Sequence, residues 1–589
     1  MNADTLPSPA LSEELELDFA TLVDVCRRHA EDRSTRSAYR WLENGEDEGA
    51  SLTFGELDRK ARAIAARLQA LGPEAPRVLV LHSGLDFVCA FLGCLYAGGA
   101  AVPVAVPRRH QRPDALLRIA LDARVDAVLA PAAVRDAMEA SGSVDGRLAR
   151  VPWIATEAID ERDGSHWVAP AIEPDRIALL QYTSGSTGAP KGVAVTHANL
   201  LHNQAMIARA FGHSESTVFV GWLPLHHDMG LIGNVLQPLF LGIPCVLMAP
   251  ESFVQKPVRW LEAITRYRAT TSGAPNFAYD LCTRRVPAER RATLDLESWR
   301  VAYNGAEPIQ AETLERFAEA FGPCGFRYES FYPCYGMAEA TLFVTGGLSD
   351  EPPAVATWED SALKEHRASS ALPGASDARR LVGCGRPWLG CRVEIVDPET
   401  LERCPPDRVG EIWLAGPSIT SGYQNQPDLS AEVFGAELAN GEGPFLRTGD
   451  LGFLRGDQLF VTGRRKDLII IRGRNHYPQD LERSVWASSP ALRQGCGVAI
   501  GVDSGSEEQL VVVQEVREAG REEAAAAAPA LESAIREAVS RHHGLRVHDV
   551  VLVPKGTIPK TSSGKLRRLE MRAAYLAGTL PPLDTVASG

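Results

Sequence analysis

The chain has 589 residues, with 61 Lys and Arg against 75 Asp and Glu, and a formal net charge of −14. This length is enough for several domains with buried cores. Proteins that bind the phosphate backbone of nucleic acids need a broad basic face, and the acidic balance argues against one. We therefore expect no nucleic-acid partner.

The N-terminal residues, Met1 to Phe19, are acidic and include no Lys or Arg. They lack the basic and apolar regions of a secretory signal, so we expect a cytoplasmic protein. None of the eleven cysteines forms a C-x-x-C pair, which argues against a zinc cluster or a disulfide framework in a chain of this size. We expect reduced, mostly buried cysteines.

Two uncharged stretches, Phe87–Pro107 and Met229–Pro250, are long enough to span a membrane. Glycines and prolines interrupt both, which is typical of a buried helix, a glycine turn and a buried strand. The predicted strands are Ala101–Val106 and Pro244–Met248. We therefore expect no membrane span.

Short apolar runs alternate with helical patterns along the first half of the chain. This alternation predicts an α/β protein whose parallel sheets are covered by helices, arranged as two α/β subdomains. The predicted strands are Val78–Leu81, Ala127–Leu129, Ile177–Tyr182, Val218–Trp222 and Thr270–Ser272.

The pattern changes after Gly383 to shorter strands with turns, which predicts a small β subdomain. Its strands are predicted at Arg392–Val396, Glu411–Leu414 and Leu459–Val461. The preceding segment, about 348–380, is rich in Pro, Ala, Ser and charge, and most of it is too polar for a core. We interpret it as a surface insertion.

The C-terminal part predicts a separate α+β domain. Leu531, Ile535 and Val539 share one face of a helix that is predicted to begin at Pro529 and end at Gly544. Strands are predicted nearby, at Val498–Val502 and Leu510–Val516.

A string of small and hydroxylated residues, Tyr182 to Gly192, follows the strand at Ile177. Its backbone N–H groups are free to surround phosphate oxygens, and Lys191 adds a positive charge. No Walker A register fits the string. The candidate phosphate-binding residues are Thr183, Ser184, Gly185, Ser186, Thr187, Gly188 and Lys191.

This string resembles the phosphate loop of the adenylate-forming superfamily, which includes acyl-CoA synthetases, adenylation domains of nonribosomal peptide synthetases and luciferases. Three further segments, Asn304–Pro308, Tyr335–Glu339 and Arg447–Asp450, resemble motifs of this family in the family's order. The resemblance implies ATP and Mg²⁺ as cofactors, with Glu339 holding the metal. The implied nucleoside-binding residues are Gly305, Ala306, Glu307, Tyr335, Gly336, Met337 and Asp450.

Two later segments resemble the remaining motifs. Gly463–Asp467 is similar to the interdomain hinge, with Arg464 at the nucleotide and Lys466 at the pivot, and Pro559–Lys565 is similar to the loop that carries the catalytic lysine, here Lys565. The implied domains are residues 1–465, which bind AMP, and a small mobile domain over residues 466–589.

The implied roles fit the chemistry. When a carboxylate attacks the α-phosphate and expels pyrophosphate, two anions meet, and the site must neutralise the developing charge. Lys565, Lys191 and a Mg²⁺ at Glu339 would do so, while Asp450 and Tyr335 hold the nucleoside in line. Isolated residues of these types are usually structural, but six motifs in order favour the site.

Within the superfamily the fatty acyl-AMP ligases match best, over segments including Leu223–Leu231, Ser272–Asp280 and Arg472–Asp480. The insertion at 348–380 lies where those ligases carry one that is associated with poor use of coenzyme A. The resemblance implies that a fatty acid is activated and passed to the phosphopantetheine thiol of an acyl carrier protein. The chain shows no carrier motif of its own, so this transfer would occur in trans.

The acyl end of the site leaves alternatives open. Ala338 stands where the superfamily usually has Thr. The pair His226 and His227 does not reveal which imidazole faces the carboxylate, although we assign His227 to catalysis. Asp228 lies about where amino-acid-activating relatives hold the substrate ammonium. Candidate pocket residues, each equally compatible with plain core, are Trp222, His226, Asp228, Met229 and Phe277.

The segment from Arg541 to Arg572 contains eight basic residues and only two acidic ones. Such a basic segment could steer an acidic carrier protein, although charge runs are usually only solvated surface. Three alternatives to the carrier-protein ligase remain: an acyl-CoA synthetase, an amino-acid-activating enzyme and a non-catalytic nucleotide-binding protein.

Overall fold

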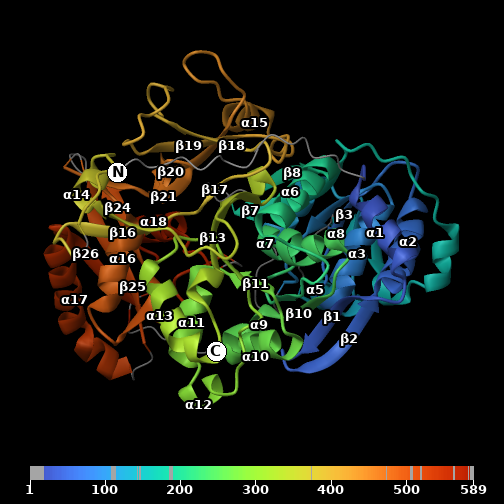
Figure 1. The fold of residues 1–589 in the computed structure, drawn as a ribbon, viewed down its shortest axis with the longest axis horizontal. Helices are drawn as coiled ribbons and strands as arrows, with labels where there is room; N and C mark the ends of the chain where they lie inside the picture. The colour runs from blue at the N-terminus through green and yellow to red at the C-terminus, as the bar shows by residue number, and fades with distance from the viewer. Residues whose placement is uncertain are drawn as a thin grey trace.

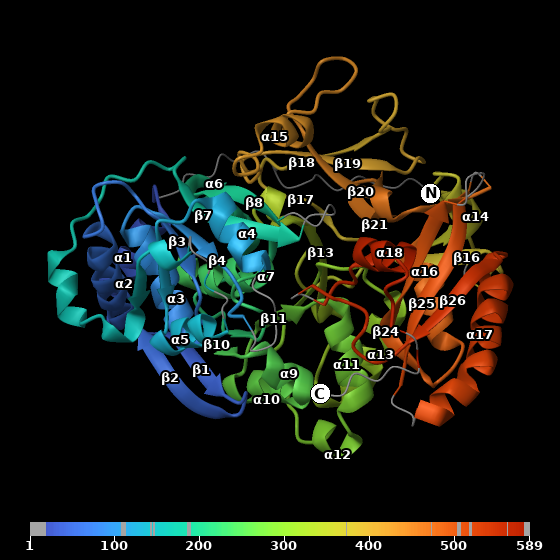
Figure 2. The same cartoon turned by 180° about the vertical axis from the view of Figure 1, so that it is seen from behind.

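The computed structural model describes residues 19–107, 114–141, 144, 148–184, 190–372, 374–472, 474–503, 508–517, 521–561, 564–581 and 583. The chain forms a large body, coloured from blue to orange, and a smaller C-terminal unit in deeper orange to red, which lies beside α11 (Asn276–Arg285) and α13 (Ala311–Phe321) (Figure 1 and Figure 2). Of the predicted phosphate loop, Gly185, Ser186, Thr187 and Gly188 lie outside the described residues.

The first sheet has six strands in the order β6-β5-β3-β4-β7-β8, and all pairs are parallel except β7 with β8. Along β3 and the residue after it, Val78 and Val80 point into one hydrophobic cluster, whereas Leu79 and Leu81 point into another. Both faces are therefore buried, as in parallel sheets generally. The strands are β6 (Trp153–Ala155), β5 (Ala127–Ala130), β3 (Arg77–Val80), β4 (Ala100–Pro103), β7 (Ile177–Ser184) and β8 (Pro190–Thr196).

The second sheet has nine strands in the order β17-β14-β13-β12-β11-β9-β10-β1-β2, with a parallel centre from β13 to β1 and antiparallel edges. Its strands are β17 (Arg386–Pro387), β14 (Phe343–Gly346), β13 (Phe331–Gly336), β12 (Val301–Asn304), β11 (Thr271–Ala274), β9 (Phe219–Gly221), β10 (Cys245–Met248), β1 (Ser37–Glu43) and β2 (Asp47–Thr53).

One hydrophobic cluster contains side chains of both sheets and of the helices α1 (Leu22–Asp32), α2 (Phe54–Gln69), α3 (Gly84–Tyr96) and α6 (His197–Ala210). Three of these helices, α1, α2 and α6, begin with a capping box. In each, the hydroxyl of the threonine before the helix accepts a hydrogen bond from the backbone N–H of the third helical residue. The side chain of that third residue in turn accepts a hydrogen bond from the backbone N–H of the threonine. The sequence therefore fixes where these helices begin.

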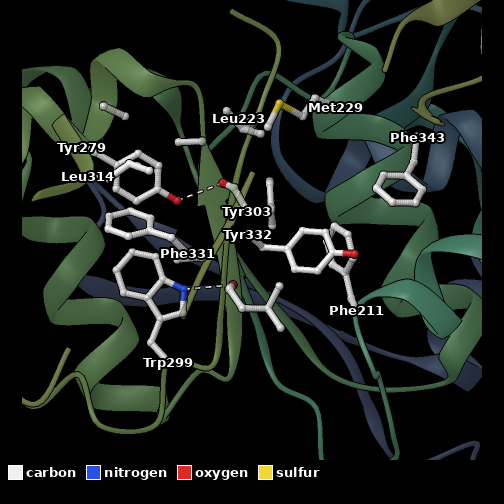
Figure 3. Packing of buried hydrophobic residues seen from close by; sticks show 14 of the residues in the cluster. Phe211, Leu223, Met229, Tyr279, Trp299, Tyr303, Leu314, Phe331, Tyr332 and Phe343 are labelled. Atoms are coloured by element: carbon white, nitrogen blue, oxygen red, sulfur yellow. Dashed lines mark hydrogen bonds between the residues drawn. The ribbon is translucent and has the colours of Figure 1, made fainter. Parts of the chain in front are cut away.

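A second cluster rich in aromatic side chains lies on both sides of the second sheet at β13 (Figure 3). The neighbouring residues Phe331 and Tyr332 of β13 point to opposite sides, as strand geometry requires. Phe331 packs edge-on against Tyr279 of α11, whose hydroxyl donates to the Tyr303 carbonyl at 2.9 Å. On the opposite side, Tyr332 lies 4.4 Å from the ring of Phe211.

The small β subdomain is the antiparallel sheet β18-β19-β20-β21. Its strands are β18 (Arg392–Val396), β19 (Gly410–Ala415), β20 (Leu446–Arg455) and β21 (Gln458–Arg464). The predicted insertion forms its own hairpin of β15 (Val355–Glu359) and β16 (Ala378–Val382), with α14 (Asp360–Lys364) after β15. Although this segment is polar overall, Trp358 and Leu363 are buried against β20 and β21. Two large apolar residues are thus enough to anchor it.

The C-terminal unit contains the sheet β24-β25-β26, the hairpin of β22 (Ile469–Ile471) and β23 (Arg474–His476), and three helices. The predicted start of a helix at Pro529 is wrong, because α17 spans Arg521–His543 with the proline inside it. The alanine-rich run before Pro529 has high helix propensity and extends the helix. The other elements are β24 (Leu492–Asp503), β25 (Glu508–Val516), β26 (Val547–Val553), α16 (Pro478–Ala487) and α18 (Arg568–Leu576).

The expected α/β class with parallel-sheet subdomains is confirmed. The two stretches considered as membrane spans form α3 with β4, and α7 (Asp228–Gly230), a π-helical turn (Leu231–Leu236) and α8 (Gln237–Leu241) with β10. Within the described ranges, no helix is both long and apolar enough to cross a membrane. The cysteines are free, and all but Cys334 and Cys404 are buried.

Trp358→Ala is expected to loosen the insertion. The indole lies edge-on to Phe453 at 4.7 Å and to Phe460 at 5.5 Å, and truncating a buried aromatic side chain costs about 3–5 kcal/mol. Hydrogen exchange of the amides in β15 and β16 should show an opening free energy lower by this amount. The exposed Val168→Ala is the control, and equal protection in both variants would contradict the anchoring role.

Candidate active site

The predicted site residues follow the carboxyl ends of neighbouring parallel strands. Trp222 follows β9, Phe277 lies just beyond β11, Gly305 follows β12, and Tyr335 lies near the end of β13. Because parallel strands end at one edge of their sheet, these residues meet there although they are far apart in the sequence.

The predicted phosphate-binding segment joins two antiparallel strands of the first sheet. Thr183 of β7 pairs with Lys191 of β8. Burial and the nearby Lys466 lower the pKa of the Lys191 ammonium, and Glu339 acts in the opposite direction. Lys466, the predicted hinge residue, therefore lies close enough to Lys191 to interact with it electrostatically.

Asp450 is 6% exposed and is held through both carboxylate oxygens. The Tyr335 hydroxyl donates to Oδ2 at 2.8 Å, and Arg464 Nε donates to Oδ1 at 3.0 Å. Burial, together with the negative charge of Asp450, raises the pKa of Tyr335 well above its ordinary value, so the phenol keeps its proton. Each carboxylate oxygen can still accept a further hydrogen bond, for example from a ribose hydroxyl.

A buried glutamate that the sequence analysis did not single out supports Asp450. Glu411 of β19 accepts from Arg447 at 2.7 Å and from the Gly449 N–H at 3.1 Å. Gly449 has a φ of +71°, which only glycine adopts without strain. A charged residue inside the apolar β19 pattern was the signal available in the sequence.

The turn Asn304–Pro308 joins β12 to the site. Glu307 Oε1 accepts the backbone N–H of Phe277 at 2.6 Å and so holds the first turn of α11. Burial raises the pKa of the Glu307 carboxyl, against the opposing influence of this N–H and of Lys565 and Lys560. In the same turn, a side chain at Gly305 would come within 3.0 Å of the Cys334 sulfur.

Lys565 reaches this site from the C-terminal unit. Its loop is closed by two hydrogen bonds with Thr561, of 2.8 and 3.0 Å, and a side chain at Gly564 would lie 3.3 Å from Phe277. Burial and Arg464 lower the pKa of Lys565, whereas the three carboxylates of Asp228, Asp450 and Glu307 act to raise it. The structure thus places Lys565 near Asp228, Asp450 and Glu307, which belong to three different motifs.

The two adjacent histidines have different environments. His227 Nδ1 lies 2.6 Å from Asp228 Oδ1, which also accepts the Met229 N–H at 2.6 Å. Burial alone would raise the pKa of Asp228, but His227 and then Lys565 lower it to about 2. His226 Nε2 is buried with no hydrogen-bond partner among the described residues, and burial lowers its pKa to about 4.

The candidate acyl-pocket residues Trp222 and Phe277 belong to an aromatic cluster. Trp222 stacks on Phe253 with ring centroids 3.9 Å apart and lies edge-on to Phe277 at 6.2 Å. Met229 is buried in the same cluster. Phe253 was not among the predicted pocket residues, because nothing in the sequence near α9 (Pro250–Gln255) distinguishes it from core.

Glu339 lies in a short turn, Ala338–Ala340, after β13. The Tyr423 hydroxyl donates to its Oε1 at 2.9 Å, which leaves Oε2 for another partner. Within the described part of the chain, no group of three or more His, Cys, Asp and Glu could hold a metal ion. A single carboxylate fits Mg²⁺, which commonly binds one protein carboxylate together with substrate phosphates.

Comparison with known proteins gives two family matches. A model of AMP-binding enzymes matches residues 26–424, and a model of the AMP domain of Disco-interacting protein 2-like proteins matches residues 466–585. The chain is 45% identical to JamA of Moorena producens over 96% of both chains. It is 36% identical to TtuA of Teredinibacter turnerae over 96% of this chain and 95% of TtuA. Both relatives are named medium-chain-fatty-acid–[acyl-carrier-protein] ligases.

Solved structures of fatty acyl-AMP ligases are also similar to this chain over nearly its whole length. A fatty acid AMP ligase from Legionella pneumophila is 42% identical, with a TM-score of 0.75, over 97% of this chain and 99% of that one. A structure from a study of fatty acyl-adenylate ligases of E. coli and L. pneumophila is 32% identical, with a TM-score of 0.85, over 96% and 99% of the two chains.

Glu307→Gln is expected to change how stability depends on pH. Because the pKa of Glu307 is raised in the folded state, the unfolded chain loses this proton first, and wild-type stability falls as the pH rises above about 4. The glutamine keeps an acceptor for the Phe277 N–H but does not ionise. Melting temperatures should therefore shift in favour of the variant as the pH rises from 4 through the raised pKa of Glu307, and the difference should then level off.

The exposed Glu319→Gln on α13 serves as the control and should show no such trend. A difference between Glu307→Gln and wild type that stays constant over this pH range would contradict the burial of an ionising carboxyl.

Proposed function

The chain belongs to the AMP-binding enzyme family, with fatty acyl-AMP ligases among its relatives, and from this premise we propose that it is a fatty acid–[acyl-carrier-protein] ligase. It would form an acyl-adenylate from a fatty acid and ATP, release pyrophosphate, and pass the acyl group to the phosphopantetheine thiol of a carrier protein. The observation that carries this proposal is the position of the half-buried Lys565: its loop lies against Phe277, and its ammonium is close enough to Asp228, Asp450 and Glu307 to interact with them electrostatically.

In the first step a carboxylate oxygen of the fatty acid bonds to the α-phosphorus while the bond to the pyrophosphate oxygen breaks. Lys565 would stabilise the negative charge where the two anions meet, and Lys191 would bind the phosphates from β8. Mg²⁺, held by Glu339, would neutralise charge on the phosphate oxygens. Asp450, Tyr335 and Arg464 would hold the nucleoside so that attack is in line.

At the acyl end, His227 and Asp228 lie next to the aromatic cluster. The apolar character of Trp222, Phe253 and Phe277 suits an alkyl chain. The alternative of an amino acid held by Asp228 is less well supported, because this carboxylate already has the His227 imidazole at 2.6 Å and the Lys565 ammonium as neighbours. A fatty acid is therefore the preferred substrate class.

For the division of the chain, we keep the boundary at Lys466. Two hydrophobic clusters consist only of residues from Ile469 onwards, which supports a separate C-terminal domain. The insertion contacts this domain through an ion pair of 2.9 Å between Arg379 and Asp480, and Asn475 donates to the Lys364 carbonyl at 2.9 Å. Transfer to the carrier protein would require Lys565 to leave the site by rotation about Lys466.

The basic segment is less available to a partner than its composition predicts. Arg568 is bound by the buried Glu482 at 2.7 Å and by Asp467 at 3.1 Å, so it belongs to the interior of the C-terminal domain. Arg541 and Arg567 pair with Glu537 and Glu570 on their own helices. Steering of an acidic carrier protein would rest on the remaining basic residues of the segment.

A two-stage assay tests the proposed function. Enzyme, ATP and Mg²⁺ are incubated with a panel of fatty acids and amino acids, and acyl-adenylates are detected by mass spectrometry. Coenzyme A or a holo-carrier protein is then added. We expect fatty acyl-adenylates and loading of the carrier. Prompt formation of acyl-CoA would favour a synthetase instead, and ATP binding without pyrophosphate release under any acid would favour a non-catalytic protein.

Lys565→Ala is expected to separate the two half-reactions. Removal of one charge at the reacting phosphate should lower acyl-adenylate formation by about 100-fold or more, while transfer from supplied acyl-adenylate to the carrier continues. Pyrophosphate exchange and carrier loading measure the two steps. The control is Lys256→Ala, which removes an exposed lysine paired with Glu46. Equal loss in both steps would contradict the role assigned to Lys565.

A further inference from the structure

Residues 417–424, here called the strap, connect the two sides of the candidate phosphate site. Towards the first sheet, the Ala194 N–H donates to the Gly422 carbonyl at 3.0 Å, and the Gln424 N–H donates to the Gly192 carbonyl at 2.7 Å. Towards the second sheet, the Thr420 N–H donates to the carbonyl of Glu339 at 3.0 Å. The strap thus binds the backbone next to Lys191 and that of Glu339 itself.

Tyr423 of the strap contacts both of these side chains. Its hydroxyl donates to Glu339 Oε1 at 2.9 Å, and the Lys191 ammonium lies 5.0 Å from the centre of its ring. The ring is buried and packs edge-on against Phe434 at 5.1 Å. A single rigid side chain therefore sets the separation between the carboxylate and the ammonium.

A tyrosine suits this place for two reasons. A ring face attracts an ammonium without occupying its three N–H donors, so Lys191 can still bind phosphate, whereas a carboxylate here would compete for them. A phenol gives the carboxylate one hydrogen bond, which fixes its orientation and leaves Oε2 free to bind a cation.

The backbone of the turn that carries Glu339 is strained at Thr341, and a hydrogen bond to the strap stabilises this conformation. Thr341, two residues later, has φ +68° and ψ −64°, a conformation that a β-branched residue rarely adopts. Its hydroxyl donates to the Ser418 carbonyl at 2.7 Å. Strained backbone persists where surrounding contacts over-determine it, which is typical of functional sites.

We propose that Tyr423 is a positioning residue, which orients Glu339 towards the cation and holds Lys191 towards the phosphates of ATP. This inference rests on the proposed function for the identity of the nucleotide. The sequence analysis assigned no role to Tyr423, because this residue lies 84 positions from Glu339 and more than 230 from Lys191.

The test compares Tyr423→Phe with Tyr423→Leu. Binding of ATP is measured by calorimetry without a divalent cation, and binding of Mn²⁺, as a probe for Mg²⁺, is measured by electron paramagnetic resonance at saturating ATP. The phenylalanine variant should bind Mn²⁺ about 10- to 100-fold more weakly, because the carboxylate loses its orienting partner. Its affinity for metal-free ATP should stay unchanged, since the ring remains beside Lys191.

The leucine variant should in addition bind metal-free ATP about 2- to 30-fold more weakly, because the ring face is lost. The matched control is Tyr575→Phe, which removes a phenol that donates to the Asp549 carboxylate at 3.0 Å outside the site. This control should bind both ATP and Mn²⁺ like wild type.

A double variant shows whether Tyr423 acts through Glu339. If it does, Tyr423→Phe combined with Glu339→Gln should bind Mn²⁺ no more weakly than Glu339→Gln alone. Additive losses, or wild-type Mn²⁺ affinity in Tyr423→Phe, would overturn the proposal. A comparable loss of metal-free ATP and Mn²⁺ binding in Tyr423→Phe would indicate a purely structural role and would also overturn it. Wild-type enzyme that binds no ATP would instead refute the proposed function.

Discussion

The position of the half-buried Lys565 side chain, close to three carboxylates, is the constraint on which the rest of the site depends. Removing an ammonium from water is costly unless opposite charges lie close to it. Here these charges are Asp228, Asp450 and Glu307, which belong to three separate segments of the body. The C-terminal unit therefore completes the site when it docks, and without the lysine the three carboxylates would lose a positive neighbour that they share.

Each of these carboxylates is held by a hydrogen-bond or ion-pair partner, which for Asp450 and Glu307 comes from another segment of the chain. Asp450 is held by Tyr335 and Arg464, Glu307 by the Phe277 N–H, and Asp228 by His227. Groups that are already oriented need not reorganise as charge develops, which is the main source of electrostatic catalysis. The motifs thus form a network whose members hold one another in place.

Seven strands of the two large sheets, β3, β4, β5, β7, β9, β10 and β11, could be predicted, because continuous apolar runs between helical patterns are typical of buried parallel strands. The start of α17 could not be predicted, because the high helix propensity of the alanines before Pro529 extends the helix beyond the proline predicted as its first residue. The burial of Trp358 could not be predicted either, because residues 348–380 are polar on average. Trp358 is buried by Phe453 and Phe460, which come about 100 residues later in the chain.

The sequence by itself determined the α/β class and the order of the motifs, since periodicity and short-range spacing are local properties of the chain. The tertiary structure decided which of these residues meet: that Lys565 faces Asp228, that His227 and not His226 pairs with this carboxylate, and that Tyr423 lies between Lys191 and Glu339. Such contacts join segments that are far apart in the chain, and they follow from how strands, turns and domains pack rather than from any local pattern.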